Sequence, residues 1–276
     1  MEKRETKIAI IDLYNNEVNE GIRCLKEIAE DTNSNQYQIP VSYKVFESRF
    51  KNEVPNMDFD IFISSGGPGS PFEGINQKWE SDYFSLIDRI LDHNQNNPER
   101  KKYIFFICHS FQMMARYFKF AEVNERYEKS FGVLPFRRTI EGKSDLILEK
   151  LVDPFYAADF RQYQVIQKNQ KIFNELGASI LALEIEDGIH ESALMAVRIS
   201  NEIVGTQFHP EADPNSMMYH LIQEERKKSI VDKFGEAKYL EMVSNLEDPD
   251  KIKLTRSSVL PVFLNSAIEE LNFINV

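Results

Sequence analysis

The chain has 276 residues, with 42% hydrophobic and 28% charged side chains, and its formal net charge is −11. This length allows one large α/β domain, or a domain of about 200 residues with an appendage. The acidic balance argues against nucleic acid and anionic membranes as partners, and no apolar run approaches the roughly 18–20 residues needed to cross a bilayer.

The chain begins with a charged stretch that leads directly into an apolar run, without a signal-peptide pattern. We therefore expect a cytoplasmic protein. The two cysteines, Cys24 and Cys108, lie far apart and do not suggest a disulfide framework, which fits a reducing compartment.

The first half of the chain alternates short apolar runs with amphipathic segments. Strands are expected at 7–13, 41–46, 59–64 and 102–108, and helices at 17–30, 78–93 and 109–120. Nearly continuous apolar runs are typical of strands buried on both faces. Their alternation with helices predicts an α/β fold, with a doubly wound, mostly parallel sheet flanked by helices.

The second half changes character. Shorter strand-like pieces are expected at 133–136, 164–166, 180–183, 193–199 and from 203, and helices at 215–228, 236–245 and 257–272. We interpret 1–215 as the main domain and 216–276 as a helical C-terminal extension packed on it. The extension could cover exposed core, form a lid near the active site, or provide a homodimer or partner surface.

Cys108 stands where an apolar strand gives way to a helix. Ligands of parallel sheets bind beyond the carboxyl ends of the strands, and a helix N-terminus favours a thiolate. The sharp turn would also offer the N–H of His109 to an oxyanion. The alternative is a buried structural cysteine, which is common at such positions.

Two further motifs also follow strands. In 66–69 (Gly-Gly-Pro-Gly), glycine permits a close backbone approach to a ligand, although a plain turn has the same composition. In 209–211 (His-Pro-Glu), proline favours an extended chain, so His209 and Glu211 project to the same side. Glu211 could then orient the imidazole as the acid of a Cys/His/acid triad, unless the histidine is incidental.

Together, the three motifs resemble the class I glutamine amidotransferases, and in particular the glutaminase domain of GMP synthase. That family has a glycine-rich oxyanion loop, a nucleophile within Gly-x-Cys-x-Gly-x-Gln, and a late His-Pro-Glu after Gly-x-Gln-Phe. The matching segments here are 66–71, 106–112 and 205–211, and the resemblance covers roughly residues 6–215. It implies a flavodoxin-like fold, and neither a metal nor a cofactor.

The resemblance also implies glutamine hydrolysis through a Cys108 thioester, with His209 and Glu211 as base and acid. The implied substrate contacts are Gly67, Gly69, His109, Gln112, Gln162 and Tyr163. The substrate would be glutamine or a γ-glutamyl-like small molecule, and the ammonia would pass to a separate synthase, because no second catalytic domain is visible.

The sequence departs from the family pattern at several positions. Phe106 and Ser110 replace the two glycines that flank the nucleophile, and 160–165 lacks the usual serine-histidine pair. The Cys108-His109 pair also resembles PfpI-type proteins, in which the adjacent histidine serves as base, but we favour His209 because a carboxylate accompanies it. The alternatives are a γ-glutamyl peptidase, a homoserine acyltransferase-like enzyme, or a non-catalytic regulatory relative.

Overall fold

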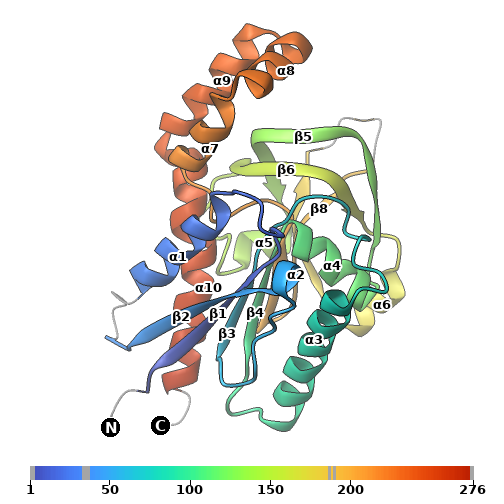
Figure 1. Cartoon of the computed structure of the whole chain (residues 1–276), viewed down its shortest axis with the longest axis vertical. Coiled ribbons are helices and arrows are strands. Elements are labelled where there is room, and N and C mark those ends of the chain that lie inside the picture. Colours follow the sequence, from blue (N-terminus) through green and yellow to red (C-terminus); the bar gives the residue numbers. More distant parts are fainter. Residues whose placement is uncertain (1–3, 33–37, 186–187, 189–190, 274–276) are drawn as a thin grey trace.

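The computed structural model describes residues 4–32, 38–185, 188 and 191–273. These residues form a nine-stranded sheet with strand order β2-β1-β3-β4-β9-β8-β7-β5-β6, flanked by helices (Figure 1). The strands are β1 (Thr6–Asp12), β2 (Val41–Glu47), β3 (Ile61–Ser64), β4 (Tyr103–Ile107), β5 (Glu122–Arg138), β6 (Phe155–Ile166), β7 (Ser179–Glu184), β8 (Leu194–Ser200) and β9 (Ile203–Thr206).

The half of the sheet from β2 to β9 is parallel. Every residue of β3 and β4 is buried, which agrees with their unbroken apolar sequences, because helices cover both faces. The order β2-β1-β3-β4-β9 is that of a flavodoxin-like sheet, so the fold class predicted from the sequence is confirmed.

The other half, from β9 to β6, is antiparallel. The expected pieces at 133–136 and 164–166 are the ends of two long strands, β5 and β6, which pair with each other. The first part of β5 is polar and largely solvent-accessible. It therefore shows no apolar pattern, which is why the sequence indicated only the buried end of the strand.

Six helices precede the C-terminal segment in the described residues, and the three long ones lie near their expected positions. The six are α1 (Gly21–Asp31), α2 (Ser48–Lys51), α3 (Lys78–Asn96), α4 (His109–Phe118), α5 (Ile140–Ser144) and α6 (Gln170–Glu175). The short helices α2, α5 and α6 were not expected, because four to six residues are too few to show a helical period.

The helices of the C-terminal segment are α7 (Pro214–Leu221), α8 (Glu224–Phe234), α9 (Glu236–Glu247) and α10 (Leu254–Phe273), with a short π-helical segment at Pro249–Lys253. The single helix expected at 215–228 is therefore two helices. In Figure 1, α10 runs alongside the parallel strands while α7, α8 and α9 rise beyond one end of the sheet.

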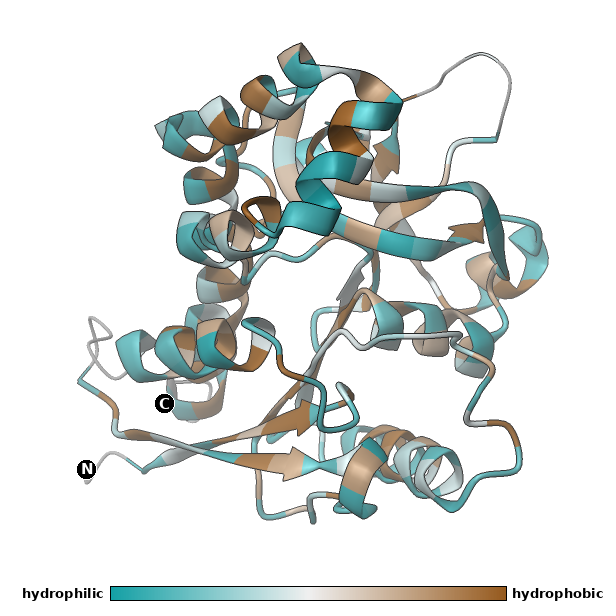
Figure 2. Cartoon of the chain, turned by 45° about the horizontal axis from the view of Figure 1, so that its top comes forward, coloured by the Kyte–Doolittle hydropathy of each residue, from teal (hydrophilic) through white to brown (hydrophobic). Residues whose placement is uncertain are grey.

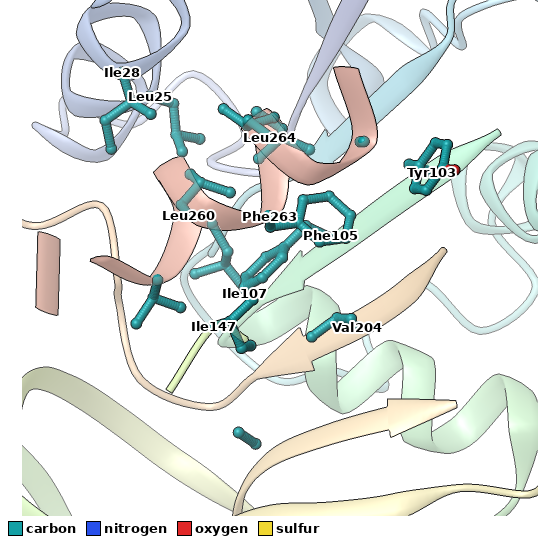
Figure 3. Close-up of a cluster of buried hydrophobic side chains, with 14 of the residues drawn as sticks. Leu25, Ile28, Tyr103, Phe105, Ile107, Ile147, Val204, Leu260, Phe263 and Leu264 are labelled. Atoms are coloured by element: carbon teal, nitrogen blue, oxygen red, sulfur yellow. The ribbon is translucent and has the colours of Figure 1, made fainter. Parts of the chain in front are cut away.

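Helix α10 belongs to the main hydrophobic core rather than to the surface. Its residues Leu260, Phe263 and Leu264 are buried in the same cluster as Leu25 of α1 and Phe105 of β4. The rings of Phe263 and Phe105 lie 5.1 Å apart in an edge-to-face arrangement (Figure 3). This helix thus covers one face of the parallel sheet.

Hydropathy along the ribbon agrees with this layering. Figure 2 shows hydrophobic residues on the central strands and alternating hydrophobic and hydrophilic turns along the surrounding helices, as expected where one side of a helix packs on a core. None of the helices within the described ranges is long and apolar enough to cross a membrane.

Candidate active site

Cys108 lies between β4 and α4 in a backbone conformation that only glycine adopts easily, with φ 50° and ψ −100°. Such a residue costs of the order of 1–3 kcal/mol and persists only when its surroundings hold it. Its backbone N–H donates to the Thr206 carbonyl at 2.8 Å. The turn is therefore a strained strand-to-helix elbow, the geometry that exposes a nucleophile at the end of a parallel sheet.

Phe106 fits next to this elbow because its neighbour across the β4–β9 pairing is Gly205. A Cβ added to Gly205 would lie 2.6 Å from the Phe111 ring, 2.8 Å from the Met114 sulfur and 3.3 Å from the Phe106 Cβ. The absence of a side chain on β9 thus leaves room for Phe111 and Met114 of α4 as well as for Phe106 on β4.

Ser110 has a more active structural role. Its buried Oγ accepts a hydrogen bond from the Ile107 N–H at 2.7 Å, and lies 2.8 Å from the Ser64 carbonyl oxygen and 3.0 Å from that of Ile107. The hydroxyl therefore satisfies backbone groups at the ends of β3 and β4, where the elbow interrupts the sheet.

His209 and Glu211 meet as expected, but the segment is not extended as predicted: Pro210 and Glu211 form a turn, in which the Ala212 N–H donates to the His209 carbonyl at 3.4 Å. The His209 Nδ1 lies 2.8 Å from the Glu211 Oε1. The backbone N–H of His209 donates to the Ala158 carbonyl of β6 at 2.8 Å. The backbone carbonyl of Glu211 accepts a hydrogen bond from Arg256 of α10. The C-terminal helix thus supports the acidic residue directly.

The charge state of His209 reflects its two neighbours. Burial lowers the pKa of His209, but the charges of Glu211 and Cys108 and hydrogen bonds to both residues outweigh burial and raise it well above its ordinary value of 6.5. The arrangement therefore favours the imidazolium form of His209, which places a positive charge next to the Cys108 side chain.

The Cys108 sulfur has two further polar neighbours. It lies 3.6 Å from Gln207 Nε2, which donates to it, and 3.5 Å from the Phe160 carbonyl oxygen. Gln112 Nε2 in turn donates to Gln207 Oε1 and to the Tyr163 carbonyl, each at 3.2 Å. The Gln112 side chain is thereby engaged in a chain of amides that ends at the sulfur.

His109 is unsuited to act as a base. Its side chain is buried, and neither ring nitrogen has a hydrogen-bond partner among the residues that the structure describes. Burial, reinforced by Arg49 and Arg116, lowers the pKa of His109 to about 3. The geometry therefore supports the choice of His209.

The glycine-rich loop lies close to this group of residues. A Cβ added to Gly66 would lie 2.7 Å from the His209 Cε1, and one added to Gly67 would lie 2.5 Å from the Leu13 carbonyl oxygen. Arg49 secures the loop by donating to the Pro68 carbonyl at 2.7 Å. Gly69 has φ +78° and lies against Glu73, on the outer side of the loop.

A cavity of about 240 Å³ opens in front of the cysteine. Of the residues predicted from the sequence, Cys108, His209, Glu211 and Gly67 line it, whereas Gly69, His109, Gln112, Gln162 and Tyr163 do not. The Gln162 amide donates instead to Glu125 at 2.5 Å. A larger cavity of about 800 Å³ lies along α10 and contains none of these residues.

Several cavity residues could not be predicted from the sequence. They include Tyr14 and Glu17 from the loop after β1, Phe160 from β6, and Met217, His220 and Arg226 from the C-terminal helices. No motif marks them, because their place in the site depends on how segments far apart in the sequence pack together. Within the described ranges, no group of three His, Cys, Asp or Glu side chains is arranged to hold a metal ion.

Comparison with known proteins agrees with this geometry. A family model described as "Glutamine amidotransferase class-I" matches residues 9–228. No curated protein sequence matches the chain.

Solved structures with the same fold include a glutamine amidotransferase from Thermotoga maritima (15% identity, TM-score 0.64, covering 96% of this chain and 98% of that one). Another is a glutamine amidotransferase from Methylobacillus flagellatus (14% identity, TM-score 0.63, covering 97% of this chain and 95% of that one). A third is the glutaminase domain of Trypanosoma brucei CTPS with bound acivicin (15% identity, TM-score 0.54, covering 75% of this chain and 86% of that one).

Proposed function

The chain belongs to the class I glutamine amidotransferases, and on that premise we propose that it hydrolyses the side-chain amide of glutamine, or of a γ-glutamyl compound, through a Cys108 thioester. The observation that carries this proposal is the strained Cys108 elbow beside a His209 whose Nδ1 lies 2.8 Å from Glu211. Strain of this kind is retained where a reaction needs it.

In the proposed first half-reaction, His209 takes the proton of the Cys108 thiol, and the thiolate attacks the amide carbon. The backbone N–H groups of Gly67 and His109 would hold the oxyanion. The His209 imidazolium then gives its proton to the departing nitrogen, so that the C–N bond breaks and ammonia or an amine leaves. Glu211 keeps the imidazole oriented and stabilises its charge throughout.

In the second half-reaction, His209 removes a proton from water, and the resulting hydroxide attacks the thioester. The C–S bond breaks, glutamate leaves, and the imidazolium returns its proton to the sulfur. Glutamine amidotransferases pass their ammonia to a synthase, and we propose that the acceptor here is a separate protein. We also propose that 1–215 form the amidotransferase domain and that 216–276 complete its site.

The test is covalent labelling together with ammonia release. The purified protein should release ammonia from glutamine, and a diazoketone mimic of glutamine should add one equivalent of mass, mapped to Cys108. Acivicin is a second probe, because the T. brucei glutaminase domain was solved with it. Cys108→Ala should take no label, whereas Cys24→Ala, which removes the other cavity cysteine, should still be labelled.

Failure of the wild-type protein to be labelled or to release ammonia, both alone and with a co-purifying synthase, would contradict the glutaminase proposal. A γ-glutamyl peptidase is the second candidate, because Gln112 and Gln162 are both bonded to protein groups outside the cavity. Turnover of γ-glutamyl peptides without turnover of glutamine would favour that candidate.

A further inference from the structure

The cavity in front of Cys108 is completed by helices that the family motifs do not include. His220 of α7 and Arg226 of α8 line the same cavity as Cys108 and His209. The two helices follow Glu211 almost directly along the chain. Their position suggests that they contact a substrate held between the cysteine and the histidine.

Helix α7 is firmly attached beside the site. Its N-cap Asp213 accepts hydrogen bonds from the Ser216 N–H at 2.6 Å and from the Arg23 guanidinium of α1 at 3.0 and 3.1 Å. The two parallel N–H···O contacts give this ion pair a defined geometry. His220 is therefore carried by an element with a fixed orientation.

Arg226 contributes a positive charge to the wall of the cavity. Its guanidinium lies over the Phe131 ring, 5.6 Å from the centroid, and no carboxylate among the described residues forms an ion pair with it. Its side chain is solvent-exposed, so its charge lies at the mouth of the cavity that contains Cys108. A guanidinium is well shaped for binding a carboxylate.

His220 lines the same cavity as Arg226 and His209. Its ring is 5.4 Å from that of Phe160, and its buried Nδ1 has no hydrogen-bond partner among the residues described. Burial, together with Arg226 and His209, lowers the pKa of His220 to about 4. The neutral ring can donate one hydrogen bond and accept another.

Two of the three acidic residues that line the cavity already have side-chain partners. Glu211 is bonded to His209 and Glu20 to Arg23, which leaves Glu17 as the carboxylate on the cavity wall without a side-chain partner in the described structure. An unpaired cation and an unpaired anion in one cavity are suited to the two charges of an amino acid.

We propose that Arg226, assisted by His220, binds a carboxylate of the substrate, so that the helical extension recognises the amino-acid end of a γ-glutamyl compound. This inference rests on the proposed function of Cys108. The carboxylate belongs either to the glutamyl group itself or to an amino acid that leaves as the amine, and a cavity of about 240 Å³ accepts a group of this size.

Four substrates distinguish these two sources. Glutamine and γ-glutamylmethylamide have only the α-carboxylate, γ-glutamylglycine has a second carboxylate on its leaving amine, and γ-aminobutyramide has none. The kcat/KM of each is compared between wild type, Arg226→Gln and Arg226→Lys. The matched control is Lys228→Gln, which removes an equal charge from an exposed position of the same helix.

Loss of an arginine–carboxylate contact should lower kcat/KM about 10- to 100-fold. If Arg226 binds the α-carboxylate, Arg226→Gln should impair every substrate except γ-aminobutyramide. If it binds the leaving group, only γ-glutamylglycine should be impaired. Arg226→Lys should recover part of the loss, and Lys228→Gln should behave as wild type. An equal effect on all four substrates, or no effect on any, would overturn the proposal.

A binding measurement separates this subsite from the chemistry. Cys108→Ala should bind glutamine or γ-glutamylglycine by calorimetry, and adding Arg226→Gln should weaken that binding about 10-fold or more. If Cys108→Ala showed this binding but the wild-type protein turned over neither compound, the subsite would stand and the proposed reaction would fail. Absence of binding to Cys108→Ala would count against the subsite.

Discussion

Ser110→Gly restores the glycine that the family pattern has two residues after the nucleophile, and yet we expect it to destabilise this protein. The hydroxyl is fully buried, accepts from the Ile107 N–H at 2.7 Å and lies 2.8 Å from the Ser64 carbonyl oxygen. Glycine would leave both backbone groups without this partner, in a place where water cannot easily replace it.

The size of the effect follows from these contacts. A buried donor left unsatisfied costs about 1–3 kcal/mol, and glycine in a helix adds about 0.5–1 kcal/mol relative to alanine. The sum is about 1.5–4 kcal/mol, which in a chain of this length corresponds to a fall in Tm of about 3–16 °C. Ser110→Ala, which lacks only the hydrogen bonds, should lose about 1–3 kcal/mol.

Chemical denaturation of the two variants and the wild type, with thermal melts in parallel, measures this difference. Labelling of Cys108 should slow in both variants, because the hydroxyl holds the strand ends on which the elbow rests. A Ser110→Gly protein as stable as the wild type would show that the hydroxyl is dispensable, and that the elbow does not depend on its hydrogen bonds to the ends of β3 and β4.

Three further changes test the site. Gly66→Ala would place a Cβ 2.7 Å from the His209 ring and should lower kcat/KM about 100-fold, whereas Gly177→Ala, with φ +65° but open space around it, should lower stability and spare activity. The pKa of His209 is raised in the folded state. The stability that this shift contributes is therefore complete below pH 6.5, the ordinary pKa, and is lost as the pH rises through the pKa of the folded state. The difference in unfolding free energy between wild type and His209→Gln should shrink as the pH rises over that range. Arg256→Gln removes the hydrogen bond to the Glu211 carbonyl and should lower kcat with little change in KM; an unchanged kcat would exclude a supporting role.

The parallel half of the fold could be predicted from the sequence because its strands are buried on both faces. Unbroken apolar runs such as 103–107 have few other interpretations. The first part of β5 lacked such a signal, since most of its side chains face solvent. The break between α7 and α8 was missed because both helices are amphipathic and only a short turn separates them.

At the candidate site, the sequence predicted the residues whose placement is set locally. His209 and Glu211 are only two positions apart, so a single turn brings them together, and Cys108 follows a strand directly. Arg226 and His220 lie beyond the motifs, and only the packing of the extension brings them to the cavity. Gln162 was assigned from its position in the family pattern, but in the structure its side chain contacts Glu125.

The place of α10 in the core has a consequence for how the molecule is made. The ribosome completes β1, β3 and β4 long before it synthesises Leu260 and Phe263, the residues that shield one face of those strands. A nascent chain must therefore carry an open apolar surface through most of its synthesis, which makes it a natural client for chaperones. The hydrogen bond from Arg256 to the Glu211 carbonyl also cannot form until the start of α10 has emerged, so the candidate site lacks this support through most of synthesis.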